Sequence, residues 1–133
     1  MTKKVLLLLA DGFEPLEAAG FTDVFGWAAL EGNEPIELVS ASFKPVLRST
    51  FGLLVMPQAQ VSELDLNDFD ALAIPGGFVR AGFYDEALSE PFLAVIRHFN
   101  ARDRDIASVC VASLALGAAG IIAGRRATIY HQV

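Results

Sequence analysis

The single cysteine of the chain, Cys110, has the clearest capacity for covalent chemistry. It lies where the apolar run 105–110, DIASVC, meets the small-residue run 111–124, VASLALGAAGIIAG. The first run predicts a buried strand and the second a helix. Cys110 would then lie at a helix N-terminus, where backbone amides stabilise a thiolate and lower the pKa of the thiol. The alternative is a core residue, because free cysteines often pack as small hydrophobes.

The residues around Cys110 are small, among them Ser108, Ala112 and Ser113. Small neighbours are typical of a nucleophile elbow, a tight strand-to-helix turn that projects a reactive side chain. The backbone amide of Val111, directly after the cysteine, would then face the reacting atoms and could donate to a developing oxyanion.

A second turn, Pro75-Gly76-Gly77, ends the apolar run 70–77, DALAIPGG. Glycines after a strand allow close backbone approach, and the amides of Gly76 and Gly77 could complete an oxyanion hole. An ordinary strand-ending turn would use the same residues.

A third turn carries two acids, Glu14 and Glu17, which share one face if the segment is helical. A carboxyl group beside a thiolate is driven toward its protonated form and could donate a hydrogen bond to it. Alternatively, both acids only stabilise the first turn of a helix. We expect Asp11 to be a helix cap or a turn residue.

The two histidines, His98 and His131, lie far apart in the sequence. We expect His98 to be solvated on the polar face of its helix, whereas His131 follows the strand-like run 127–130, where a general base could sit. One cysteine and two distant histidines lack the usual spacing of a metal site. We therefore expect no metal and no organic cofactor.

Strands alternate with helices along the chain. Apolar runs predict strands at 3–10, 35–42, 70–77 and 105–110, and a further strand begins at 126. The segment 44–58 is either a short hairpin or an excursion of the chain. Helical spacing relates Leu16, Ala19, Gly20, Val24 and Trp27, and in 86–103 it relates Phe92, Val95, Ile96 and Phe99. This alternation predicts a parallel sheet covered on both faces, with the three turns together at the carboxyl ends of the strands.

Composition limits the partners. A chain of 133 residues that is 53% hydrophobic fits one domain, 1–133, and its net charge of −6 argues against a nucleic-acid partner. A lone cysteine excludes a disulfide framework and fits the cytoplasm. The apolar run Val5 to Ala10 is too short for a signal peptide. The uncharged run 106–124 is long enough to span a membrane, but its small residues and strand-like start favour a buried segment.

The three turns, in this order, resemble the ThiJ/PfpI superfamily, which includes the parkinsonism-associated protein, intracellular protease-like proteins, glyoxalase III and isonitrile hydratases. LLLLADGFEPLEA (6–18) resembles the first strand and acidic turn, and LAIPGG (72–77) the oxyanion loop. SVCVASLALGAAGIIAGRRAT (108–128) resembles the elbow and following helix, and is most similar to the isonitrile hydratase branch. The resemblance implies Cys110 as nucleophile, Glu17 beside it, and an oxyanion hole at Gly77 with Gly76.

The resemblance also implies a fold: a flavodoxin-like three-layer α/β sandwich of the class I glutamine amidotransferase-like type. It has a mainly parallel sheet and a nucleophile elbow, and it implies a homodimer. The family continues through a further strand and helices, so the chain is expected to be truncated at its C-terminus. A third hypothesis is the ligand-sensing domain of a transcriptional regulator. It is the least favoured of the functional hypotheses, because the DNA-binding module of that subfamily is not expected in this chain.

Three positions depart from the family pattern. Ala112 replaces the usual elbow glycine, and Val111 replaces the histidine of protease-like members, so we expect no peptidase activity. The position of a histidine found in many members is Tyr130, and His131 comes one residue later. In a strand that single step points its side chain to the opposite face.

These observations predict a cytoplasmic, cysteine-dependent and cofactor-independent lyase or hydratase that acts on a small electrophile, an isonitrile or an α-oxoaldehyde. The alternative is a non-enzymatic redox-sensing or chaperone-like protein of oxidative stress, whose Cys110 is oxidised reversibly. Cys110 and Glu17 are the candidate catalytic residues, and Gly77, Val111 and Gly76 the candidate oxyanion hole. Further candidates are Glu14, Tyr130 and His131. We expect a small-molecule substrate, a homodimer, and neither a nucleic acid nor a membrane as partner.

Overall fold

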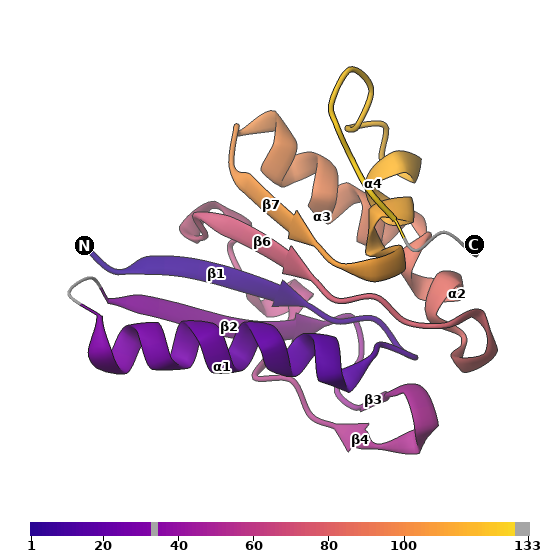
Figure 1. Ribbon diagram of the computed structural model, residues 1–133, viewed down its shortest axis with the longest axis horizontal. Coiled ribbons are helices and arrows are strands. Elements are labelled where there is room, and N and C mark those ends of the chain that lie inside the picture. The colour runs from indigo at the N-terminus through magenta and orange to yellow at the C-terminus, as the bar shows by residue number, and fades with distance from the viewer. Residues whose placement is uncertain (33–34, 130–133) are drawn as a thin grey trace.

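The computed structural model describes residues 1–32 and 35–129. Its centre is a five-stranded sheet in the order β5-β2-β1-β6-β7, in which every neighbouring pair is parallel. The strands are β1 (Lys3–Leu8), β2 (Ile36–Ser42), β5 (Ala59–Gln60), β6 (Ala71–Ile74) and β7 (Asp105–Ser108). Figure 1 shows β1, β6 and β7 running in one direction, so their carboxyl ends share one edge. The parallel sheet that the sequence predicts is confirmed.

Helices lie on both sides of this sheet and form a three-layer sandwich (Figure 1). Helix α1 (Pro15–Glu31) packs on β2, whereas α3 (Glu90–Ala101) packs on β6 and β7 and against α4 (Ser113–Ala118). The short helix α2 (Phe83–Ala87) precedes α3. The predicted hairpin is present as β3 (Leu47–Arg48) and β4 (Leu54–Val55), an antiparallel pair. Short 3-10 helices lie at Thr50–Gly52, Val61–Glu63, Leu66–Asp68, Val79–Ala81 and Cys110–Ala112.

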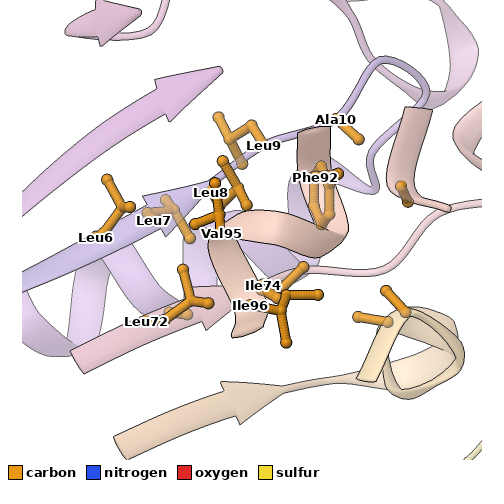
Figure 2. Packing of buried hydrophobic residues seen from close by; sticks show 14 of the residues in the cluster. Leu6, Leu7, Leu8, Leu9, Ala10, Leu72, Ile74, Phe92, Val95 and Ile96 are labelled. Carbon is orange, nitrogen blue, oxygen red and sulfur yellow. The ribbon is translucent and has the colours of Figure 1, made fainter. Parts of the chain in front are cut away.

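The core lies between the sheet and α3. Leu6, Leu7 and Leu8 of β1 are fully buried, as a strand covered on both faces requires. Figure 2 shows Val95 and Ile96 of α3 beside the leucines of β1 and the β6 residues of the same core cluster. The predicted helical face Phe92, Val95, Ile96 and Phe99 is buried throughout. Each such side chain stabilises the fold by about 2 kcal/mol relative to exposure.

Helix α1 is confirmed as a helix, but the apolar residues that recur along it are not in the core. Leu16, Val24 and Trp27 are exposed, and Ala18 is the one fully buried residue of the helix. Phe21 and Phe25, on the same side as Ala18, pack against the core instead. The helix is apolar on both sides, so apolar spacing alone does not identify its buried face.

The segment after Cys110 is less regular than predicted. Helix α4 ends at Ala118, and Gly120 follows with φ +81°, a left-handed residue that terminates a helix. The strand expected from residue 126 is absent over 126–129, and its remainder lies outside the described residues. Within residues 1–32 and 35–129, no helix is long and apolar enough to cross a membrane. The run 106–124 divides instead into β7, a turn and α4.

Candidate active site

Cys110 lies at the apex of a sharp turn between β7 and α4. Its φ is +54°, a left-handed conformation that costs a residue with a side chain about 1–2 kcal/mol. Ala112 and Ser113 are buried behind it, and the Ser113 hydroxyl donates to the Cys110 carbonyl at 3.3 Å. This strand, strained residue and helix in succession have the geometry of a nucleophile elbow.

Glu17 reaches across to the loop that follows β6. Its Oε2 accepts a hydrogen bond of 2.7 Å from the backbone amide of Gly76. A Cβ built on Gly76 would lie 3.0 Å from both Glu17 Oε2 and the Cys110 Cβ, so the carboxylate and the thiol are neighbours across this glycine. The carboxyl group that the acidic turn predicts beside the cysteine is therefore present.

Glu14 has a different role in the same turn. It is the N-cap of α1, and its Oε1 accepts from the Leu16 amide at 3.3 Å. Its own amide donates to the Gly76 carbonyl at 2.7 Å. Gly76 is thus fixed through its carbonyl by Glu14 and through its amide by Glu17.

Asp11 is a turn residue, since Glu14 takes the capping position. Its carboxylate accepts from the Arg48 amide at 2.8 Å and from the Lys44 Nζ at 2.8 Å. Burial raises the pKa of Asp11, but these two hydrogen bonds and the charges of Lys44 and Arg48 outweigh it and hold the pKa below its usual value. Asp11 therefore ties the first turn to the β3–β4 hairpin.

Both glycines of the second turn lie in tight surroundings, and Gly77 leaves no space for a side chain. A Cβ on Gly76 would lie 3.0 Å from the Cys110 Cβ and 3.0 Å from Glu17 Oε2. A Cβ on Gly77 would lie 2.5 Å from the Gly12 carbonyl and 2.6 Å from the ring of Phe83. Gly77 also pairs with Phe13 in an isolated antiparallel bridge. The three turns predicted to meet at this edge of the sheet are therefore in direct contact.

The pKa of Cys110 is raised, contrary to the expectation of an acidic thiol. Burial is the largest cause, followed by the hydrogen bond to Glu17, and the charges of Glu17 and Glu14 add to it. The Val111 amide acts in the opposite direction but does not compensate. The helix expected to stabilise a thiolate, α4, has only six residues and no long macrodipole. A raised pKa keeps the Cys110 thiol protonated at neutral pH, with the Glu17 carboxylate beside it.

No pattern in the sequence identifies one neighbour of Cys110. Tyr84 of α2 is half-buried, and its pKa is raised by burial and by the charge that Cys110 carries when ionised. Helix α2 has five residues, too few for a periodic pattern. The adjacent residue, Phe83, packs against Gly77, which holds α2 beside the loop after β6.

The remaining candidates lie apart from this cluster or cannot be placed. His98 is half-buried, and its Nε2 atom is buried and has no hydrogen-bond partner among the described residues, so the imidazole is only partly solvated. Tyr130 and His131 lie outside the described residues. Within the part of the chain that the structure describes, no three His, Cys, Asp or Glu side chains are grouped to hold a metal ion.

A family model described as the DJ-1/PfpI family matches residues 3–133. The chain belongs to the DJ-1/PfpI family. This confirms the resemblance that the three turns show. The chain is 34% identical to the isonitrile hydratase of Pseudomonas putida over 136 residues, covering all of the chain and 56% of that protein. It is 30% identical to a deglycase of Pyrococcus abyssi, covering 98% of the chain and 74% of that protein.

Solved structures of the DJ-1/PfpI family share the fold. Oxidised DJ-1 of Toxoplasma gondii matches with a TM-score of 0.80 and 26% identity, over 96% of the chain and 67% of that structure. A DJ-1 superfamily protein of Agrobacterium tumefaciens matches with a TM-score of 0.68 and 30% identity, over 90% of the chain and 60% of that structure. The chain therefore spans about two thirds of the length of these structures.

Proposed function

We propose that this DJ-1/PfpI protein is a cofactor-independent hydratase or lyase whose nucleophile, Cys110, attacks a small isonitrile or α-oxoaldehyde. One observation supports this most strongly: the Glu17 carboxylate is bound by the Gly76 amide and lies beside the Cys110 side chain. A protonated thiol needs a base in contact with it, and Glu17 is held in place to serve as that base. Relatives named isonitrile hydratase and deglycase agree with this class of reaction.

The proton moves through Glu17 in each half of the proposed reaction. As the Cys110 sulfur bonds to the electrophilic carbon, its S–H bond breaks and the proton passes to the Glu17 carboxylate. Glu17 returns that proton to the carbon of an isonitrile, which gives a thioimidate, or to the oxygen of an aldehyde, which gives a hemithioacetal. Hydrolysis of the thioimidate by one water gives a formamide and frees the thiol. In the aldehyde case, a proton shift to the neighbouring carbonyl carbon gives a thioester, which water converts to a 2-hydroxy acid.

Backbone amides stabilise the charge that develops on the adduct in this proposal. Gly77 and Val111 supply the donors, and the Val111 amide already interacts with the Cys110 sulfur. Gly76, whose amide is bound to Glu17, positions that carboxylate rather than serving the oxyanion. In this proposal Tyr84 donates a further hydrogen bond to the adduct, with a hydroxyl that stays protonated at neutral pH.

The redox-sensing alternative is less well supported by the state of the thiol. The thiolate is the form that peroxide oxidises, and the raised pKa of Cys110 leaves little of it at neutral pH. Slow oxidation does not suit a sensor, whereas a protonated thiol beside a base suits a nucleophile that ionises only during reaction.

The exposed side of α1 supports the proposal of a homodimer. Leu16, Val24, Trp27 and Leu30 project from one side of this helix and are all exposed. A contiguous apolar face of this kind marks an interface, and a two-fold axis would pair the helix with its copy. The cytoplasm is the proposed compartment, because a single free thiol acts best in a reducing environment.

Turnover on matched substrates tests the enzymatic proposal. We expect the protein to hydrate simple isonitriles or methylglyoxal, Cys110→Ser to abolish this activity, and Glu17→Gln to lower kcat by about a hundredfold or more. Turnover by Cys110→Ser would disprove the mechanism. No turnover on any substrate, with reversible oxidation of Cys110 by peroxide, would favour the redox-sensing protein.

A further inference from the structure

A cavity lies at the same edge of the sheet, between the β3–β4 hairpin and the segment after Gly77. We call it the hairpin cleft; its volume is about 600 Å³. Its main side chains come from two short stretches, and they are Arg48, Thr50, Phe51, Phe78, Val79 and Arg80. Neither Cys110 nor Glu17 lines it, so it is separate from the candidate catalytic groups.

The apolar part of the hairpin cleft is unusual for a folded surface. The Phe51 side chain is 98% exposed and its backbone is left-handed, with φ +64°. A bulky side chain in this conformation costs free energy, and here it gains no packing in return. Phe78 and Val79, across the cleft, are exposed as well. Three apolar side chains around one hollow form a surface that a ligand with an apolar group would bury.

The charged part of the cleft is cationic in a protein of net charge −6. Among the described residues, neither Arg48 nor Arg80 forms an ion pair, whereas Arg97 and Arg104 do. Asp11 interacts electrostatically with Arg48 but is bound by Lys44 at 2.8 Å. Two guanidinium groups beside aromatic rings are thus available to an anionic ligand.

Hydrogen bonds and direct contacts connect the hairpin cleft to the candidate active site. Thr50 donates from its amide to the Phe13 carbonyl at 2.9 Å and from its hydroxyl to the Gly12 carbonyl at 3.0 Å. Phe13 pairs with Gly77, whose neighbour Gly76 contacts Cys110. The cleft is therefore connected, through the loop after β1 and the loop after β6, to the turn that carries Cys110.

We infer that the hairpin cleft binds the carboxylate, and the adjoining aromatic or branched apolar group, of the small molecule whose electrophilic carbon reacts at Cys110. The link to Cys110 depends on the proposed function, whereas the binding itself does not. A carboxylate fits better than a phosphate, because phosphate sites usually offer free backbone amides. Here the amides of Ser49, Thr50, Gly52 and Ala81 already donate within the protein.

Binding is tested first, in the Cys110→Ser variant, so that no turnover is needed. Phenylacetate is titrated against its neutral isostere phenylacetamide and against phenyl phosphate, and amide chemical shifts are followed by NMR. We expect phenylacetate to bind most tightly of the three. Arg48→Gln and Arg80→Gln should each weaken it about tenfold, because a charge-assisted hydrogen bond is lost. Arg102→Gln is the control, since Arg102 is exposed at the end of α3 and does not line the cleft.

Equal binding of phenylacetamide, or unchanged binding in both arginine variants, would overturn the inference. Tighter arginine-dependent binding of phenyl phosphate would overturn the assignment to a carboxylate.

Turnover then separates this inference from the proposed function. With the unmodified catalytic cysteine, 4-isocyanobenzoate should have a higher kcat/KM than phenyl isocyanide, and Arg80→Gln should remove the difference. If phenyl isocyanide reacts equally well and the arginine variants bind phenylacetate normally, the cleft inference fails while the proposed function stands. If phenylacetate binds through the arginines but neither isocyanide reacts, the binding site stands and the proposed reaction fails.

Discussion

The Glu17 carboxylate accepts a 2.7 Å hydrogen bond from the Gly76 amide, which joins two residues 59 positions apart in the chain. Through this bond, the first turn of α1 and the loop after β6 hold one carboxylate oxygen in a fixed place. The Cys110 thiol lies beside the same carboxylate, which raises the pKa of the thiol. The position of the proposed base is thus set by the backbone of a different strand, which gives it the preorganisation that proton transfer requires.

Removal of the Glu17 charge should make Cys110 more acidic. The pKa of Cys110 is raised by burial, then by the hydrogen bond and charge of Glu17. In the unmodified protein, the ultraviolet absorbance of the thiolate should therefore develop above the ordinary cysteine pKa of about 8.5. Glu17→Gln keeps an acceptor for the Gly76 amide but removes the negative charge, so the titration should move to lower pH.

Glu31→Gln is the matched control, since Glu31 is exposed at the other end of α1. It should leave the titration of Cys110 where it was. An unchanged titration in Glu17→Gln would contradict the contact between these two side chains.

The spacing at Gly76 should make even one methyl group harmful. In Gly76→Ala, the new Cβ would lie 3.0 Å from both the Cys110 Cβ and Glu17 Oε2, so thiol and carboxylate must move apart. We expect a loss of kcat/KM of about a hundredfold, with destabilisation of about 1–3 kcal/mol from overpacking. Substrate turnover and urea unfolding measure the two effects.

Gly26→Ala is the control for that substitution, because a Cβ at Gly26 meets nothing within 4 Å. Within a helix, alanine is more favourable than glycine, so this variant should be more stable by about 0.5–1 kcal/mol and fully active. Full activity in Gly76→Ala would show that the close approach of the two loops does not matter for the reaction.

The sequence predicts the sheet and the proximity of the three turns because both follow from local patterns. Leu6 to Leu8 form an apolar run too continuous for an exposed strand, and Phe92, Val95, Ile96 and Phe99 follow helical spacing. The carboxyl ends of parallel strands necessarily share an edge, so the order of strands and turns along the chain is enough to place Glu17, Gly76 and Cys110 together.

The electrostatic state of the site could not be predicted in this way. The pKa of Cys110 depends on burial and on which atom of Glu17 faces the thiol, and neither leaves a pattern in the sequence. Tyr84 reaches the site through the packing of a five-residue helix. The sequence also does not show which side of α1 is buried. Phe21 and Phe25 on one side and Trp27 on the other are all apolar, and only the first two pack against the core.

Asp11 should stabilise the protein in a pH-dependent manner. Burial raises the pKa of Asp11, but its bonds to Lys44 and the Arg48 amide outweigh this and leave the folded-state pKa below the unfolded value. The stabilisation is therefore complete above about pH 4, the ordinary aspartate pKa, and is lost as the pH falls through the lowered folded value. Asp11→Asn should reduce the free energy of unfolding at pH 7 and flatten its decline in acid.

Urea unfolding at a series of pH values measures this effect, with Asp23→Asn as the control. Asp23 is exposed on α1, and its side chain has no salt-bridge or hydrogen-bond partner within the described part of the chain. An identical acid decline in the unmodified protein and Asp11→Asn would show that the tie to the hairpin contributes nothing to stability.

The exposed side of α1 should control self-association. Trp27 is 60% exposed and Leu30 is 78% exposed, so neither contributes much to the fold of one subunit. If these residues pack against a second copy, Trp27→Lys combined with Leu30→Lys places four charges in a two-fold interface and should give a monomer by sedimentation velocity at micromolar concentration. The midpoint of urea unfolding should then depend on protein concentration in the parent chain but not in the double variant.

Leu53→Lys is the control, because Leu53 is also apolar and exposed but lies on the hairpin. A parent chain that sediments as a folded monomer would refute the homodimer, and a double variant that remains a dimer would place the interface on another face.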